Sequence, residues 1–207
     1  MRRLAVLASG RGTNFRALAE AARGGVLGGE IAVLATDQPE AGALEVARRF
    51  GIPAERLDPG PLRTRLSADA ERQWVGQLRS YDVDTVLLAG FMRILHETFL
   101  GAFPDRVLNI HPSLLPAFPG VDAIARAFAH GVRVTGCTVH LVTQGVDEGP
   151  ILAQSAVPVL EDDTLETLSA RIHEAEHALY PRIVRAFLER PFAIEGRRLV
   201  WRAAGVT

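Results

Sequence analysis

Short apolar runs alternate with segments of helical period along most of this chain, and the alternation limits the folds open to it. Strands are predicted at RLAVLAS (3–9), EIAVLATD (30–37), DTVLLAG (84–90) and RVLNIH (106–111), with helix-period segments between them. Because these strands are apolar on both sides, both faces of their sheet should be covered, as in parallel strands joined by helices. The pattern predicts an α/β fold with a single doubly wound, mostly parallel sheet and helices on both faces.

The second half of the chain departs from this pattern. The segments RVTGCTVHLVT (133–143) and GPILAQSAVPV (149–159) are alternating strands with a short connection, so they should pair as an antiparallel extension of the sheet. A long helix over 164–189 and a short hairpin over 192–201 should follow. The length of 207 residues is that of one medium α/β domain.

Composition excludes several classes of function. A net charge of −1, from 23 basic and 24 acidic residues, gives no global field that would attract nucleic acid or an anionic membrane. The apolar run before Ser9 is too short for a signal peptide or a membrane span, so we expect a cytoplasmic protein. The single cysteine, Cys137, excludes an internal disulfide and a cysteine-clustered zinc site. Every basic residue is an arginine, which excludes Schiff-base chemistry and a lysine-bearing phosphate loop.

The segment NIHPSLLP (109–116) places an amide and an imidazole at the end of an apolar strand. The two-residue period of a strand puts Asn109 and His111 on the same face, and Pro112 should end the strand directly after them. The pair is either a hydrogen-bonded polar pair in the core or part of a reaction site at the sheet edge.

Two further segments also follow predicted strands. The segment SGRGTN (9–14) precedes a helix that Thr13 or Asn14 could cap, and backbone N–H groups at a helix start bind anions such as phosphate. It is either such a site or a plain turn. It lacks the third glycine of a dinucleotide fingerprint, because Phe15 stands at that position. The segment GVDEGP (145–150) supplies Asp147, either as a turn residue or as an acid for a cleft.

In open α/β sheets, ligands bind beyond the carboxyl ends of the strands near the point where the strand order reverses. The segments SGRGTN, GFMRIL (90–95) and NIHPSLLP all follow strand ends. The sequence therefore predicts a shared cleft at this edge.

Taken together and in this order, LASGRGTN, VLLAGFMRIL, NIHPSLLPAFPG and GVDEGPIL closely resemble the phosphoribosylglycinamide formyltransferases of purine biosynthesis. The resemblance runs from Leu4 to about Leu188. It implies transfer of a formyl group from the co-substrate 10-formyltetrahydrofolate to the amine of glycinamide ribonucleotide, with no metal. It also implies a ribonucleotide phosphate-binding half (1–90), a catalytic and folate-binding half (91–190) and a C-terminal tail (191–207). Related families carry an added domain, for which we expect no room in this chain.

The resemblance also implies roles for individual residues. The catalytic residues would be Asn109, His111 and Asp147. The ribonucleotide would contact Gly12, Thr13, Asn14 and Glu176. The folate would contact Arg65, Met92, Arg93, Ile94, Leu95, Asn109, Thr143 and Val146. The folate-contacting arginine is Arg65 when counted from one flanking motif, with Arg63 as the second choice. Asp122 and Ile124 stand where some family members have histidines, so no substrate role is assigned to that segment.

The residue types suit this reaction. Attack of an amine on a formyl carbon creates a tetrahedral oxyanion, to which the Asn109 amide and a protonated His111 can donate hydrogen bonds. The Asp147 carboxylate would favour the imidazolium and help to move the proton. The alternatives are a formyltetrahydrofolate hydrolase, a nicotinamide-dependent oxidoreductase, or a non-catalytic nucleotide-binding module of Rossmann-like fold. The expected partners are small-molecule substrates, and the expected state is a monomer or a homodimer.

Overall fold

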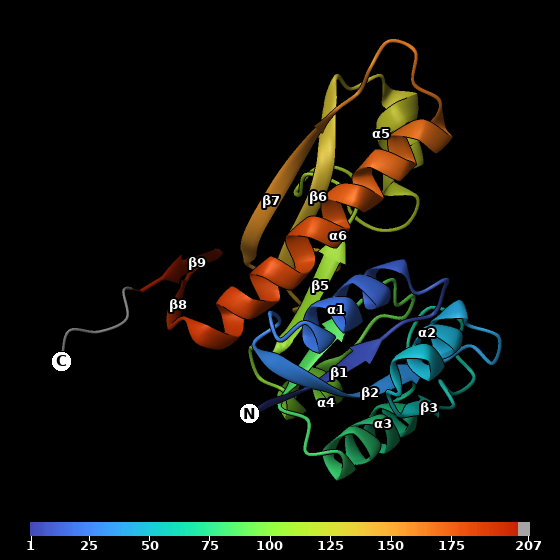
Figure 1. Cartoon of the computed structure of the whole chain (residues 1–207), viewed down its shortest axis with the longest axis vertical. Helices are drawn as coiled ribbons and strands as arrows, with labels where there is room; N and C mark the ends of the chain where they lie inside the picture. The colour runs from blue at the N-terminus through green and yellow to red at the C-terminus, as the bar shows by residue number, and fades with distance from the viewer. Residues whose placement is uncertain (203–207) are drawn as a thin grey trace.

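The first strand, β1 (Arg2–Leu7), lies between two other strands inside the sheet, because its last four residues are apolar and bury both of its faces. Its last four residues are fully buried, and it pairs in parallel with β2 (Gly29–Thr36) on one side and β4 (Thr85–Leu88) on the other. The computed structural model describes residues 1–202, and in that range nine strands form a single sheet (Figure 1).

The remaining strands extend this centre in both directions. They are β3 (Ala54–Arg56), β5 (Val107–His111), β6 (Val134–Leu141), β7 (Ile151–Pro158), β8 (Phe192–Glu195) and β9 (Arg198–Trp201). The order is β3-β2-β1-β4-β5-β6-β7-β9-β8. The first five strands in this order are parallel. β6 is antiparallel to both β5 and β7, whereas β7 pairs with β9 in parallel and β9 pairs with β8 in the antiparallel sense. The predicted fold class, including the antiparallel extension and the terminal hairpin, is confirmed. The short edge strand β3 and the return of β9 beside β7 were not predicted.

Helices cover both faces of the sheet. They are α1 (Thr13–Arg23), α2 (Gly42–Phe50), α3 (Ala68–Ser80), α4 (Glu97–Ala102), α5 (Ala123–His130) and α6 (Leu165–Glu189). One apolar core joins the sheet to α1, α2, α5 and α6, and a second core joins the opposite face to α3 and α4. Figure 1 shows α6 running along the antiparallel strands and past α1. None of the helices within residues 1–202 combines the length and the apolar character needed to cross a membrane.

Glycines in the left-handed conformation stand at the end of α2 and at the start of α1. Gly51 caps α2 in a left-handed conformation, with φ 68°. The cap of α1 is Gly12, also left-handed with φ 78°, and not Thr13 or Asn14 as predicted. A Cβ atom at Gly12 would lie 2.7 Å from the Cα of Ala43, so the close approach of α2 requires glycine there.

A buried tyrosine joins α6 to the centre of the sheet. The Tyr180 hydroxyl donates to the carbonyl of Leu88 at the end of β4, 3.0 Å away, and lies 3.2 Å from the carbonyl of Leu108 in β5. Burial raises the pKa of Tyr180 well above its ordinary value, so the hydroxyl stays protonated. One side chain therefore fixes α6 to two neighbouring strands.

The strand order reverses beside β1. The chain runs from β1 outward through β2 to β3 and then crosses back to β4 on the other side of β1. The carboxyl ends of β1, β4 and β5 therefore meet at one edge, as the predicted cleft requires.

Candidate active site

The end of β5 brings the polar pair to the sheet edge. Asn109 is half-buried and His111 is the last residue of the strand, directly before Pro112. The antiparallel register places Asn109 opposite His140 of β6. The segment is therefore a strand end with its polar side chains on one face, as the sequence predicts.

His111 is held between two oxygen acceptors. Its Nδ1 atom lies 3.2 Å from Oδ2 of Asp147, and its Nε2 atom lies 2.9 Å from the carbonyl oxygen of Phe118. A carbonyl and an ionised carboxylate can only accept hydrogen bonds, so both ring nitrogens act as donors. This geometry suits the imidazolium form of His111.

Asp147 reaches His111 from the loop between β6 and β7. Its backbone is left-handed, with φ 55°, and its Oδ2 atom also accepts a 2.7 Å hydrogen bond from the Gly120 N–H. Burial raises the pKa of Asp147, but the contacts with His140, Gly120 and His111 outweigh burial and hold the pKa below its ordinary value. The carboxylate is therefore ionised at neutral pH.

The structure adds one residue that the sequence analysis missed, His140. Its Nδ1 atom lies 2.8 Å from the carbonyl of Leu141, which can only accept, so Nδ1 carries a proton. Its Nε2 atom lies 3.1 Å from the Asn109 amide nitrogen and 3.5 Å from Oδ1 of Asp147. His140 Nε2 therefore accepts a hydrogen bond from the Asn109 amide and orients it. The one indication in the sequence is that His140 lies inside the predicted strand RVTGCTVHLVT.

The start of α1 offers backbone donors. The backbone N–H of Arg16 donates to the Gly12 carbonyl, which is the first hydrogen bond of α1. The backbone N–H groups of Thr13 and Asn14 have no acceptor within the described residues. No side chain caps this helix end. These donors remain available to an anion.

The side chain of Asn14 is used elsewhere. It donates a 2.9 Å hydrogen bond to Oε2 of Glu176, which is 2 % exposed on α6. His173 Nδ1 contacts the same oxygen at 2.9 Å. The structure thus brings Asn14 and Glu176 together, although they are far apart in the sequence.

The loop after β4 is fixed by a buried acid. Asp37, whose side chain is 1 % exposed, pairs with Nε of Arg93 at 2.8 Å and accepts a 2.6 Å hydrogen bond from the Ser9 hydroxyl. Met92 N–H in turn donates to Ser9 Oγ at 3.0 Å. Burial raises the pKa of Asp37, but Ser9, Arg93 and Gln38 together lower it below the ordinary value. The Arg93 guanidinium also donates to the carbonyls of Leu62 and Arg63, so its side chain is engaged by other parts of the chain.

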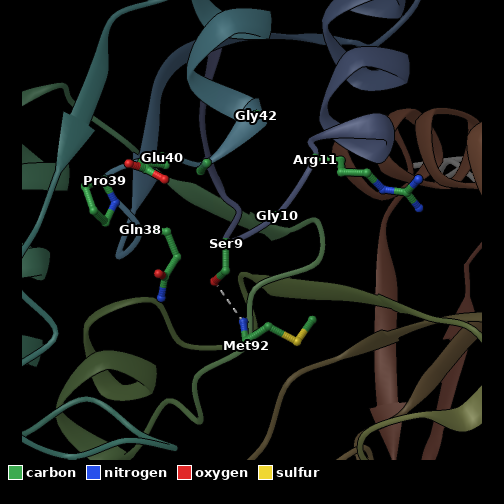
Figure 2. A pocket seen from close by; sticks show the side chains of 9 residues that line it. Ser9, Gly10, Arg11, Gln38, Pro39, Glu40, Gly42 and Met92 are labelled. Atoms are coloured by element: carbon green, nitrogen blue, oxygen red, sulfur yellow. Dashed lines mark hydrogen bonds between the residues drawn. The ribbon is translucent and has the colours of Figure 1, made fainter.

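The same contacts argue against a nicotinamide site. Asp37 follows β2, where dinucleotide-binding folds place an acid for the ribose hydroxyls. Here its carboxylate is already occupied by Ser9, Gln38 and Arg93. A cavity of about 500 Å³ does lie between residues 9–11, residues 38–42 and Met92 (Figure 2). Asn109, His111 and Asp147 do not line this cavity.

The remaining residues predicted to contact folate differ in exposure and in position. The backbone of Arg65 pairs with Ile94, and the exposed Arg65 side chain lines a cavity of about 280 Å³ with neighbours from α3 and α4. Thr143 and Val146 are exposed on the Asp147 loop, whereas Leu95 is buried at 2 % exposure. Within residues 1–202, no group of three or more His, Cys, Asp or Glu side chains is arranged to hold a metal ion.

The open α/β sheet brings the Asn–His–Asp set and the uncapped start of α1 to the carboxyl ends of its strands, where enzymes of this architecture bind their substrates. A family model described as "Formyl transferase" matches residues 2–184. The chain belongs to the formyl transferase family.

Relatives of known sequence and structure agree with this assignment. The phosphoribosylglycinamide formyltransferase of Bacillus subtilis (strain 168) is 43 % identical over 188 residues, which cover 91 % of this chain and 95 % of that protein. The crystal structure of glycinamide ribonucleotide transformylase 1 from Symbiobacterium toebii is 50 % identical, with a TM-score of 0.91, and the match covers 97 % of this chain and 94 % of that one. The phosphoribosylglycinamide formyltransferase from Bacillus halodurans is 46 % identical, with a TM-score of 0.85, over 91 % and 96 % of the two chains.

Proposed function

We propose that this chain transfers the formyl group of 10-formyltetrahydrofolate to the primary amine of 5'-phosphoribosylglycinamide. The products are 5'-phosphoribosyl-N-formylglycinamide and tetrahydrofolate, and the reaction belongs to purine biosynthesis. The observation that carries the proposal is the His111 imidazole, held as a double donor beside Asp147 and next to Asn109. The family and the relatives support the same reaction.

The geometry suggests how the reaction proceeds. The substrate amine attacks the formyl carbon, forming a new C–N bond and a tetrahedral oxyanion. The oxyanion takes the position of the Phe118 carbonyl on His111 Nε2, and the second N–H of the Asn109 amide completes the stabilisation. Asp147 accepts the proton released by the amine, directly or through water. Collapse of the intermediate restores the formyl C=O and breaks the bond to the folate nitrogen, which takes up the proton that Asp147 received, directly or through water.

The two substrates would approach from opposite sides of this centre. The ribonucleotide phosphate would bind the backbone N–H groups of Gly12, Thr13 and Asn14, with Glu176 contacting the same substrate. The formylfolate is a co-substrate and would lie against the residues proposed for it: Arg65, Met92, Arg93, Ile94, Leu95, Asn109, Thr143 and Val146. Arg63 is the second choice for Arg65.

The proposed function divides the chain into three parts. Residues 1–90 would bind the ribonucleotide phosphate, and residues 91–190 would carry catalysis and folate binding. The tail, 191–207, includes β8 and β9, and its last five residues lie outside the described part. We expect the enzyme to act in the cytoplasm on small molecules, as a monomer or a homodimer.

The test is an assay of purified protein with 10-formyltetrahydrofolate, with and without the ribonucleotide. Tetrahydrofolate should form only when the ribonucleotide is present, and nicotinamide absorbance should stay flat when those cofactors are added. Equal turnover in water alone would identify a hydrolase. A His111→Ala variant that folds and binds the ribonucleotide should be inactive; full activity in it would exclude the proposed centre.

A further inference from the structure

The loop that carries Asp147 has few attachments of its own. Between Thr143 and Gly149, within the described residues, the hydrogen bonds involve only the Asp147 carboxylate and the carbonyl of Glu148. The loop is nevertheless tightly shaped, because a Cβ atom at Gly149 would lie 1.8 Å from the carbonyl of Leu141. Asp147 itself holds a left-handed backbone, which is unfavourable unless the surroundings enforce it.

The attachment at Glu148 comes from the C-terminal hairpin. Arg197, in the turn between β8 and β9, donates from Nη2 to the Glu148 carbonyl at 3.2 Å. The neighbouring Arg198 pairs with Ile151, so β9 meets β7 just after the chain leaves the Asp147 loop. The hairpin lies beyond the family match, which ends at residue 184.

The hairpin can hold the loop because it is itself anchored to α6. Phe192 stacks on Phe187, with ring centroids 5.0 Å apart, and Trp201 meets Phe192 edge-on at 6.2 Å. The Arg190 guanidinium lies 5.0 Å from the centre of the Trp201 ring. Phe187 is 2 % exposed and belongs to the core, so these contacts connect the hairpin to the body of the enzyme.

We propose that Arg197 is a positioning residue, which fixes the Asp147 loop from outside and thereby sets the approach of Asp147 to His111. The Asp147 carboxylate is bound by the Gly120 N–H and by His111 Nδ1. Arg197 binds the carbonyl of the following residue, Glu148. Without Arg197 the loop keeps only its inner contacts, and the carboxylate samples positions farther from His111. The effect on the reaction rests on the proposed function, in which Asp147 acts on the reacting groups.

The experiment compares Arg197→Ala with Arg197→Lys and with the control Arg198→Ala. Arg198 lies in the same hairpin and has the same charge, but its guanidinium has no hydrogen bond within residues 1–202. We expect Arg197→Ala to lower kcat by about three- to ten-fold, as the loss of one surface hydrogen bond allows, with the KM for the ribonucleotide unchanged. Arg198→Ala should match the wild type, and Arg197→Lys should recover part of the loss.

A second measurement does not depend on activity. The Gly120 amide is protected by its hydrogen bond to Asp147, so its hydrogen exchange should be several-fold faster in Arg197→Ala and unchanged in Arg198→Ala. If Arg197→Ala equals Arg198→Ala in both kcat and exchange, or lowers kcat without altering exchange, the proposal is wrong. If the wild type shows no ribonucleotide-dependent activity but Gly120 responds as expected, the positioning role stands and the proposed function fails.

Discussion

Asp147→Asn is the sharpest test of the charge arrangement at the site, because the amide keeps the shape of the side chain and removes its charge. The carboxylate lies 3.2 Å from His111 Nδ1, and the two side chains are 11 % and 7 % exposed. At an effective dielectric constant of about 20, two unit charges at this distance attract by roughly 5 kcal/mol. The cost of desolvating the two groups offsets part of this attraction. We take about half of the attraction, ~2.5 kcal/mol, as the stabilisation of the imidazolium that is lost in Asp147→Asn.

That loss converts into two observable effects. The alkaline limb of the kcat–pH profile should move to lower pH, because the negative charge beside His111 Nδ1 is removed. At neutral pH, kcat should fall by about 10²-fold, since the carboxylate that accepts the proton in the proposed reaction is gone. Ribonucleotide affinity should change little, because the start of α1 lies at a different strand end.

The assay is the ribonucleotide-dependent conversion of formylfolate, measured from pH 5 to 9 for the wild type and two variants. Glu148→Gln is the matched control: it removes the same charge from the neighbouring residue, whose side chain is exposed. The control should retain the wild-type profile. A profile of Asp147→Asn that overlays the wild type, with kcat within about three-fold, would refute the reasoning and leave Asp147 as a turn residue.

The same carboxylate should make folding stability depend on pH. Its pKa is depressed in the folded chain below the ordinary value of 3.8, so its stabilising contribution is complete above that range and is lost as the pH falls through the lowered pKa. The difference in melting temperature between the wild type and Asp147→Asn should therefore be largest near neutral pH and shrink in acid.

Three further outcomes follow from the structure. Asn109→Ala should lower kcat by about 10²–10³-fold, the usual loss for one oxyanion donor, and thermal melts should show a folded variant; a variant that only unfolds would identify a core residue. Calorimetry should show that a ribonucleotide analogue without its phosphate binds at least tenfold more weakly, since the N–H groups of Thr13 and Asn14 lose their anion; equal affinity would place the phosphate elsewhere. Cys137 is buried, and burial raises its pKa to about 12, so native protein should not react with a thiol reagent at pH 8, whereas unfolded protein should titrate one thiol.

The sequence was sufficient for the parts of the fold that depend on local pattern. Apolar strands alternating with helix-period segments define the parallel sheet, and the two-residue period of β5 places Asn109 beside His111. The strand ends converge because parallel strands point the same way. The same reasoning could not find β3, whose three residues carry no apolar run.

The features that sequence analysis missed or assigned differently depend on contacts between segments far apart in the sequence. His140 faces Asn109 only through the register of β6 against β5, and no spacing in the sequence specifies that register. Asn14 was expected to be able to cap α1, but Glu176, 162 residues later, binds its side chain. The contact between Arg197 and Glu148 likewise requires β9 to lie beside β7, which a hairpin pattern alone does not imply.

The Tyr180 hydroxyl also bears on how this enzyme can move. Because it bonds to carbonyls of both β4 and β5, sliding of one strand past the other would leave a fully buried hydroxyl or carbonyl without its partner. The ends of these strands, and the turn of α6 that carries Glu176, therefore behave as one stiff body. Any rearrangement during turnover must then fall to the loops at the strand ends. In the proposed reaction, one such change is that the Phe118 carbonyl would leave His111 to make room for the oxyanion. We therefore expect the sheet to stay rigid during turnover and the loops to move.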